Sequence, residues 1–254
     1  MSAKRAGNEE DRLRQDLSGK TALVTGASSG IGRAMALALA EEGVRLALVG
    51  RSEERLRGVG DRIAGETLVL SADLTQPAEV DRAVAETIAR FGQIDILLPN
   101  AGLFIPGNVV DGEPDKWDEM LSINVNSVFR LVRAVLPAMV ARQSGHILIT
   151  SSISGHEAIH WEPVYSASKH AIQSFAHGLR RQVLKDNIRV GSVAPGIVLN
   201  ELWGYTDPAT IAAKVSSREG LRSEDVADAV VFMLTRPPNV TIRDLVILPQ
   251  AQDI

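Results

Sequence analysis

Short apolar runs and amphipathic helical patterns alternate along the chain from Lys20 onward. The short runs are apolar throughout, rather than at every second residue, which is typical of strands that are buried on both faces. Seven such runs occur, at residues 21–25, 44–49, 68–70, 94–98, 147–150, 188–193 and 244–248. Helical patterns separate them at 31–41, 77–90, 114–141, 163–184 and 223–234. The alternation predicts an α/β protein: a single doubly wound Rossmann-type domain, in which helices cover both faces of a parallel sheet of about seven strands.

One domain accounts for this pattern. No repeat, low-complexity tract or Gly/Pro-rich linker divides it, and 254 residues suit one large α/β domain. Residues 1–16 are polar, mixed in charge and without the apolar core of a signal peptide. We therefore expect a mobile tail over residues 1–16 and a single Rossmann-fold domain over residues 17–254. Residues 195–220 are irregular and follow a strand's carboxyl end, so we expect a lid or binding loop there.

Composition excludes several classes of function. The chain has no cysteine, which excludes disulfides, thiolate catalysis and zinc–thiolate sites. Its net charge of −4, without a basic block, argues against nucleic-acid binding. No apolar run approaches the ~20 residues of a membrane span. His156 and His160 have no acidic cluster beside them, so no metal site is expected. These features predict a cytoplasmic protein without a metal, a membrane or a nucleic-acid partner.

A glycine-rich turn joins the first strand to the first helix. Its sequence from Thr25 to Gly32 is TGASSGIG. Glycines allow the backbone to turn tightly and approach a pyrophosphate, and the helix N-terminus offers free N–H groups to it. The spacing is not the common Gly-x-Gly-x-x-Gly, and glycines also mark ordinary turns, but the position between strand and helix favours a phosphate cradle. The candidate cofactor contacts here are Gly26, Ser28, Ser29, Gly30, Ile31 and Gly32.

Further candidate cofactor contacts follow the third and fourth strands. Asp73 and Leu74 are placed to meet the adenine, although Asp73 could equally form a turn or cap a helix. The run Asn100-Ala101-Gly102 would close the far wall of the same crevice, because the carboxyl ends of parallel strands share one edge of the sheet.

The end of the second strand bears on the choice of cofactor. NAD sites usually have an acidic residue there for the ribose hydroxyls, whereas NADP sites have an arginine nearby for the 2′-phosphate. This chain has Gly50 at that position, followed by Arg51. NADP is therefore favoured and NAD is the alternative. Arg51 could also belong only to the solvated charge cluster at residues 51–55.

Tyr165 and Lys169 lie four residues apart on a predicted helix and therefore share one face. A free tyrosine has a pKa of about 10, and a nearby ammonium group favours the phenolate. We therefore expect Lys169 to lower the pKa of Tyr165 and make it an acid/base. Ser152 follows the fifth predicted strand, where its hydroxyl could hold a substrate oxygen. The pair alone could be an ordinary amphipathic contact, but it follows the phosphate turn and the serine in the expected order.

Together these motifs resemble the short-chain dehydrogenase/reductase family from about Leu17 to the C-terminus. The resemblance implies an NAD(P)-dependent oxidoreductase whose catalytic residues are Asn124, Ser152, Tyr165 and Lys169. Asn124 would hold a water molecule that links Lys169 to solvent. The resemblance also implies that the nicotinamide faces Pro195, Gly196 and Val198, and that a homotetramer forms through the helices at 114–141 and 163–184 and the last strand.

Three further segments, at 112–118, 161–165 and 239–244, resemble the ribitol 2-dehydrogenases of that family. The likeness implies that a secondary alcohol of a ribitol-like polyol and a D-ribulose-like ketose are interconverted. Those enzymes are associated with NAD and an acidic residue after the second strand, from which Gly50 departs. The chain also departs from the family pattern at Asn200, where threonine is frequent, at Pro99, and at a C-terminus without Asp-Gly-Gly.

The predicted substrate space combines hydrogen-bonding groups with indoles, which suits a small neutral polyhydroxy ligand. Its candidate residues are Ser152, Ser154, Tyr165, Trp161, Asn200 and Trp203, with His156, His160 and Glu201 nearby. Two other functions stay open: an NADP-dependent reductase of hydroxy-acid, aldehyde or ketone substrates, and a nucleotide-binding regulator without turnover. The complete set of catalytic residues argues against the regulator.

Overall fold

A seven-stranded parallel sheet forms the centre of the protein, whose computed structural model describes residues 14–254. The strands lie in the order β3-β2-β1-β4-β5-β6-β7, so the order reverses between β1 and β4. Their bounds are Thr21–Thr25 (β1), Arg45–Gly50 (β2), Thr67–Ser71 (β3), Ile96–Leu98 (β4), Gly145–Thr150 (β5), Ile188–Pro195 (β6) and Asp244–Ile247 (β7). The predicted fold class is confirmed.

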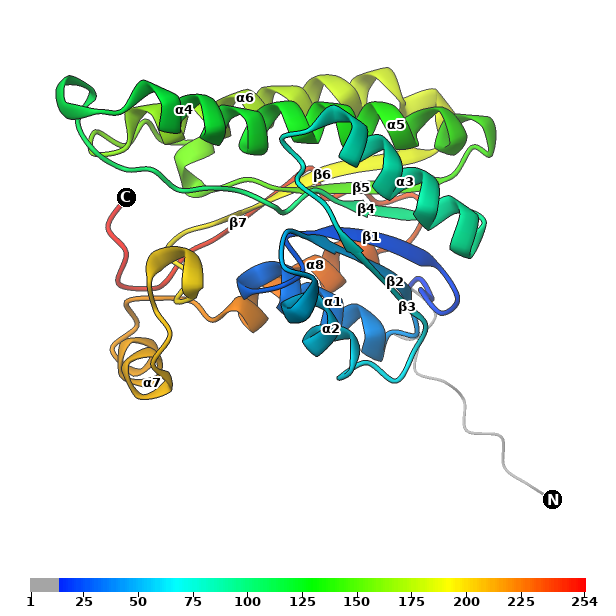
Figure 1. The fold of residues 1–254 in the computed structure, drawn as a ribbon, viewed down its shortest axis with the longest axis horizontal. Coiled ribbons are helices and arrows are strands. Elements are labelled where there is room, and N and C mark those ends of the chain that lie inside the picture. Colours follow the sequence, from blue (N-terminus) through cyan, green and yellow to red (C-terminus); the bar gives the residue numbers. More distant parts are fainter. Residues whose placement is uncertain (1–13) are drawn as a thin grey trace.

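Helices cover both faces of this sheet (Figure 1). One face carries α1 (Gly30–Glu41), α2 (Glu53–Gly60) and α8 (Ser223–Leu234). The other carries α3 (Pro77–Phe91), α4 (Pro114–Leu121), α5 (Ser127–Ala141) and α6 (Pro163–Gln182). A proline stands in the first turn of α3, α4 and α6, as predicted, because that position needs no backbone N–H donor.

Neighbouring residues of one strand pack into two different cores. Leu23, Leu97 and Ile147 belong to the core under α3, α5 and α6. The next residue in each strand, Val24, Leu98 or Leu148, belongs to the core under α1 and α8. This arrangement explains why the strands are apolar at every position rather than at every second one.

The predicted helix at 114–141 is continuous but contains a π-helical turn, Ser122–Asn126, between α4 and α5. Its 28 residues are long and apolar enough to cross a membrane by length and composition, contrary to the expectation that no run approaches a span. Leu131, Val135 and Met139 of α5 are fully buried against the sheet. One face of α5 is therefore packed on the sheet, and 39% of the apolar window is buried.

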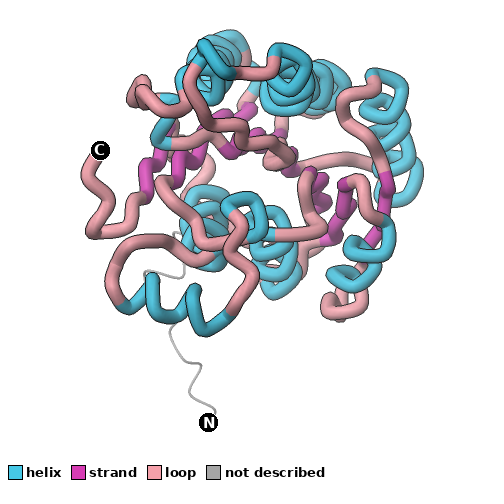
Figure 2. The backbone as a smooth tube through the Cα atoms, turned by 60° about the vertical axis from the view of Figure 1, so that its left-hand side comes forward, coloured by secondary structure: helices cyan, strands magenta, loops and turns pink. Residues whose placement is uncertain are grey.

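The predicted irregular stretch at 195–220 contains one further helix, α7 (Pro208–Ser216). None of its residues is buried, and it stands apart from the helices that cover the sheet (Figure 1), as the backbone view also shows (Figure 2). The first thirteen residues of the predicted tail lie outside the described residues. Gln15 donates its backbone N–H to the Thr235 carbonyl at 2.7 Å and accepts from Arg189 at 2.6 Å, so contacts with the domain begin before Leu17.

The helices and the last strand through which a tetramer was predicted are present, and they carry exposed apolar side chains. Phe129 of α5 is 37% exposed and stacks on Phe175 of α6, with ring centres 4.4 Å apart. Val246 of β7 is 45% exposed at the end of the sheet. The homotetramer stays a prediction.

Candidate active site

Asn100 ties together the carboxyl ends of three strands. It follows β4, and at the end of β1 its backbone N–H donates to Thr25 Oγ1 at 2.9 Å while its Nδ2 donates to the Thr25 carbonyl at 3.0 Å. Its Oδ1 accepts from Thr150 Oγ1, at the end of β5, at 3.1 Å. The sheet order reverses at this edge, which is where ligands bind in open α/β sheets. A crevice opens there, and it is bordered by every predicted cofactor contact except Gly32.

The glycine turn between β1 and α1 leaves no room for side chains. A Cβ atom on Gly32 would lie 2.3 Å from the Gly26 carbonyl oxygen, and one on Gly26 would lie 3.0 Å from the Ala101 Cα. Gly26 and Gly30 have φ angles of 67° and 49°, which side chains other than glycine rarely adopt. Gly32 therefore packs against the backbone of the turn and does not line the crevice, whereas Gly26 and Gly30 do.

A carboxylate lies at the start of α1, inside this turn. Glu201 Oε2 accepts from the Gly30 N–H at 3.1 Å, and its Oε1 lies 2.9 Å from Arg33 Nη1. Burial alone would raise the pKa of Glu201, but these hydrogen bonds and the Arg33 charge lower it below its ordinary value. The turn thus already binds an anionic group, which is what a dinucleotide pyrophosphate requires of a helix N-terminus.

The adenosine half of the crevice is lined by the ends of β2 and β3. Asp73 Oδ1 accepts from the Thr75 N–H at 3.0 Å and from its hydroxyl at 2.8 Å, so Asp73 is a turn former that also borders the crevice. Arg51, with its side chain 70% exposed, lies 3.9 Å from Glu119. Arg55 of α2 borders the same space and was not predicted. With its glycine cradle and two guanidinium groups, the crevice fits a nicotinamide dinucleotide.

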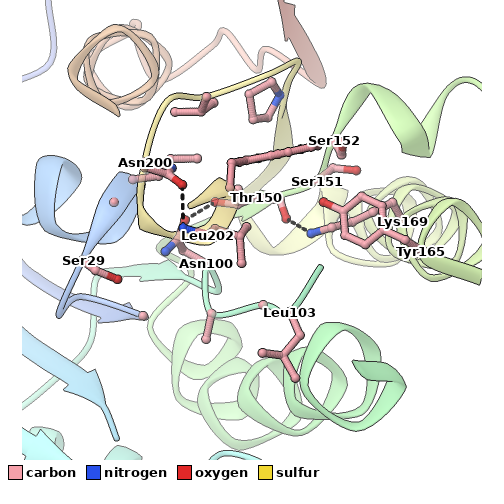
Figure 3. A pocket seen from close by; sticks show the side chains of 18 of the residues that line it. Ser29, Asn100, Leu103, Thr150, Ser151, Ser152, Tyr165, Lys169, Asn200 and Leu202 are labelled. Atoms are coloured by element: carbon pink, nitrogen blue, oxygen red, sulfur yellow. Dashed lines mark hydrogen bonds between the residues drawn. The ribbon is translucent and has the colours of Figure 1, made fainter. Parts of the chain in front are cut away.

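Tyr165, Lys169 and Ser152 meet at the other end of the crevice, opposite Ser29, Asn100 and Asn200 (Figure 3). Tyr165 and Lys169 come from the start of α6 and are each 6% exposed. Lys169 Nζ donates to the Thr150 carbonyl at 3.1 Å and lies 5.7 Å from the Tyr165 ring centre. Ser152 and Tyr165 line the same part of the crevice. The predicted acid/base pair and the substrate-holding serine are therefore brought together.

Burial, rather than Lys169, dominates the protonation of Tyr165. Loss of hydration raises the pKa of Tyr165 above its ordinary value of 10.0. The nearby Ser152 hydroxyl opposes this rise, and the charge of Glu162 adds to it. The expectation that Lys169 lowers the pKa of Tyr165 is thus wrong for the protein alone. Burial also lowers the pKa of Lys169 from 10.5 to about 8, because a charged ammonium is poorly hydrated there.

Asn124 lies in the π-helical turn and is 2% exposed. Its Oδ1 accepts from the Leu103 N–H at 2.8 Å, and its Nδ2 donates to the Leu103 carbonyl at 2.9 Å and to Ser168 Oγ at 3.3 Å. Asn124 therefore anchors the loop after β4 to α6. It does not border the crevice, and its contact with a water molecule stays a prediction.

An aromatic wall stands over Tyr165. Phe104 packs edge-on against the Tyr165 ring, with centres 4.9 Å apart, and against Trp203 with centres 4.2 Å apart. Trp203 belongs to the short turn Glu201–Trp203, so this wall joins the loop after β4 to the loop after β6. Phe104 was not predicted, because a lone phenylalanine in a loop carries no motif.

The other predicted substrate residues divide into two groups. Asn200 and Trp203 border the crevice, where Asn200 Oδ1 also caps the turn through the Leu202 N–H at 3.0 Å. Ser154 is buried behind Ser152, and Trp161 is 48% exposed, with its ring against His160 at 4.7 Å between centres. His156 and His160 are exposed. The structure therefore keeps Ser154, Trp161 and both histidines out of the crevice lining.

Replacement of Lys169 by Met should raise stability at pH 7, because it removes a buried ammonium group. The folded-state pKa of about 8 lies below the ordinary 10.5, so the cost of burial is complete below pH 8 and disappears as pH rises toward 10.5. We expect a gain of about 1–2 kcal/mol at pH 7 that shrinks by pH 9.5. Urea unfolding of wild type, Lys169→Met and the exposed control Lys185→Met measures this. A loss of stability in Lys169→Met at pH 7, or a pH-independent gain, would contradict it.

Replacement of Glu201 by Gln should strengthen dinucleotide binding, because the carboxylate and a pyrophosphate compete for the Gly30 N–H. We expect Kd for NADP, measured by titration calorimetry, to fall about three- to tenfold, the range of one charge at a helix N-terminus. The control is Glu66→Gln, which breaks an exposed Glu–Arg pair away from the crevice. Weaker or unchanged NADP binding in Glu201→Gln would show that Glu201 does not occupy the phosphate position.

Comparisons with known proteins agree with this geometry. Residues 20–209 match the family model for short chain dehydrogenases. A protein named as an uncharacterized oxidoreductase of Staphylococcus saprophyticus is 38% identical over 240 residues, which cover 92% of this chain and 99% of that protein.

Two solved structures have the same fold. Serine dehydrogenase in complex with NADP+ has a TM-score of 0.85 and 29% identity, covering 92% of this chain and 96% of that one. L-Sorbose reductase of Gluconobacter frateurii, in complex with NADPH and L-sorbose, has a TM-score of 0.82 and 29% identity, covering 92% and 98%. With the glycine cradle and the Ser–Tyr–Lys cluster in place, the chain belongs to the short-chain dehydrogenase family and is an oxidoreductase of that family.

Proposed function

We propose that the protein interconverts a secondary alcohol of a ribitol-like polyol and the corresponding ketose, with NADP as the hydride carrier. The observation that carries the proposal is the meeting of Ser152, Tyr165 and Lys169 at the end of the dinucleotide crevice, beside the aromatic wall of Phe104 and Trp203.

Each residue of the cluster has a separate part in this reaction. Ser152 holds the reacting oxygen of the substrate. Tyr165 takes the hydroxyl proton in the direction of oxidation and returns it in the direction of reduction. Lys169, fixed by the Thr150 carbonyl, supplies positive charge near the phenol and would hold the cofactor ribose by hydrogen bonds. A bound nicotinamide supplies the hydride acceptor or donor.

The cofactor preference rests on the end of β2. Gly50 offers no carboxylate to the ribose, while Arg51 and Arg55 border the adenosine half and could pair with a 2′-phosphate. The two solved relatives described above were determined with NADP+ and NADPH. These features support NADP over NAD.

The substrate class rests on the lining of the other half. Asn200 and Ser152 offer hydrogen bonds to hydroxyl groups, and Trp203, which packs against Phe104, offers an apolar face to carbon–hydrogen surfaces. Among described residues, Lys169 is the one cation that lines this half, which does not favour a carboxylate substrate such as a hydroxy acid. The solved relative with L-sorbose acts on a sugar, which also supports a polyol and ketose pair.

Loss of the Tyr165 hydroxyl should stop turnover and leave the cofactor crevice intact. We expect Tyr165→Phe to lower kcat by about a thousandfold or more, with Kd for NADP within about twofold of wild type. NADPH absorbance at 340 nm with ribitol, other pentitols, hydroxy acids and simple alcohols measures this and ranks the substrates. The control is Tyr205→Phe, which changes the chain's other tyrosine. Retained turnover in Tyr165→Phe would refute the role of Tyr165, and a preference for hydroxy acids would refute the polyol.

An acidic residue at position 50 should reverse the cofactor preference. A Cβ atom on Gly50 would lie 3.5 Å from Leu56 Cδ2 and from Ser28 Oγ, which is ordinary contact, so an aspartate fits. We expect Gly50→Asp to lower kcat/KM for NADP at least tenfold and raise it for NAD, because a carboxylate repels the 2′-phosphate and binds ribose hydroxyls.

Arg51→Ala should lower kcat/KM for NADP by about tenfold and leave kcat/KM for NAD unchanged. A tenfold loss corresponds to one charge-assisted contact with the 2′-phosphate. Arg57→Ala is the matched control, since Arg57 pairs with Glu53 on α2 and does not border the crevice. A wild-type preference for NAD that survives Arg51→Ala would refute the assignment of NADP.

A further inference from the structure

A buried carboxyl group ends a chain of hydrogen bonds behind Ser152. Glu162 is 3% exposed, and its Oε1 accepts from Ser154 Oγ. Ser154 Oγ in turn accepts from Ser152 Oγ at 3.2 Å, and Ser152 lines the crevice together with Tyr165. Neither Glu162 nor Ser154 borders the crevice. Glu162 is thus linked to the reacting hydroxyl groups without being able to touch a substrate.

Local structure does not account for the buried carboxyl group. Glu162 stands at the N-cap position of α6, where a side chain commonly accepts a backbone N–H, but its side chain makes no such bond. Burial raises the pKa of Glu162, and the bond from Ser154 only partly opposes this rise. A carboxyl group in such a place costs stability, and a titratable group perturbed by burial beside a crevice is a candidate for a functional role.

The hydrogen bonds that run from Ser152 through Ser154 to Glu162 have a fixed donor-to-acceptor direction when Glu162 is ionised. An ionised carboxylate only accepts hydrogen bonds, so Ser154 must donate its single hydroxyl proton to Glu162. Ser152 must then donate its own proton to Ser154, as the geometry shows. Ser152 Oγ also accepts from the Ser154 N–H at 3.1 Å, so one of its lone pairs is left to accept a hydrogen bond from the alcohol hydroxyl or from Tyr165.

Few titratable groups among the described residues lie near these hydrogen bonds. Those that face Tyr165 are Lys169, from the same helix, and Glu162; Phe104, which packs on the ring from the loop after β4, does not titrate. Glu162 itself faces Ser154 from the turn Ile153–Gly155 and Tyr165 from α6. Removing the charge of Glu162 therefore acts on Tyr165 directly as well as through Ser152.

We propose that Glu162 is a positioning residue, which through Ser154 fixes the direction of the Ser152 hydroxyl and so controls proton exchange at Tyr165. The inference rests on the proposed function, because it assumes that Ser152 and Tyr165 handle the reacting oxygen. Ser154, expected from sequence in the substrate space, becomes the link between Glu162 and Ser152.

A double-mutant cycle tests this role. We expect Glu162→Gln and Ser154→Ala each to lower the plateau kcat for ribitol oxidation with NADP about tenfold, since each leaves Ser152 free to point the wrong way. The double variant should be no slower than either single one, because the first substitution already breaks the chain. Glu157→Gln, an exposed carboxylate in the same loop, is the control.

The pH profile separates positioning from a structural role. Because the charge of Glu162 raises the pKa of Tyr165, Glu162→Gln should move the rising limb of kcat for oxidation to lower pH, by about half a unit or more. A merely structural role would lower the melting temperature and leave this limb in place.

Three outcomes decide the matter. Losses of kcat that multiply to about a hundredfold in the double variant would overturn the inference, and so would a Glu162→Gln enzyme with unchanged kcat and pH limb. Both leave the proposed function standing, because wild type turns over in each case. A wild type inactive on every alcohol and ketone of the panel would overturn the proposed function and, with it, any role of Glu162 in proton exchange.

Discussion

The hydrogen bonds of Asn100 are the constraint on which the site depends. Through Thr25 and Thr150 they hold the ends of β1, β4 and β5 in one arrangement, at the edge where the strand order reverses. The glycine turn continues from β1 and Ser152 follows β5, so both are placed by the same contacts. The crevice is therefore defined by the sheet itself, and α7 and the turn at Glu201–Trp203 are added around it.

Burial then determines the chemistry of the groups in that crevice. The same loss of hydration raises the pKa of Tyr165 and of Glu162 and lowers that of Lys169. The phenol therefore stays protonated at neutral pH, while the ammonium group keeps its charge below its pKa of about 8, and each is sensitive to any charge that arrives nearby. Proton transfer in the protein is thus controlled by neighbours, which gives a single carboxyl group such as Glu162 its influence.

Much of the fold and the site could be predicted from the sequence because the signals are local. Each of these signals is a pattern within a few residues: the apolar strands, the first-turn prolines, the TGASSGIG turn and the Tyr165–Lys169 pair. Helices α2 and α7 were missed although Ser52 and Asp207 cap them, since short helices carry a weak periodicity. What depends on distant contacts could not be predicted: the π-helical turn at Asn124, the place of Phe104, the position of Ser154 behind Ser152, and the sign of the Tyr165 pKa shift, which burial by distant elements decides.

The most direct measurement is a crystal structure of the protein with NADP and an unreactive polyol. The account predicts that the Glu201 carboxylate leaves the Gly30 N–H, that the 2′-phosphate lies against Arg51 and Arg55, and that one polyol hydroxyl bonds both Tyr165 Oη and Ser152 Oγ. A polyol bound away from Tyr165 and Ser152, or a dinucleotide bound while Glu201 keeps its contact with Gly30, would contradict it.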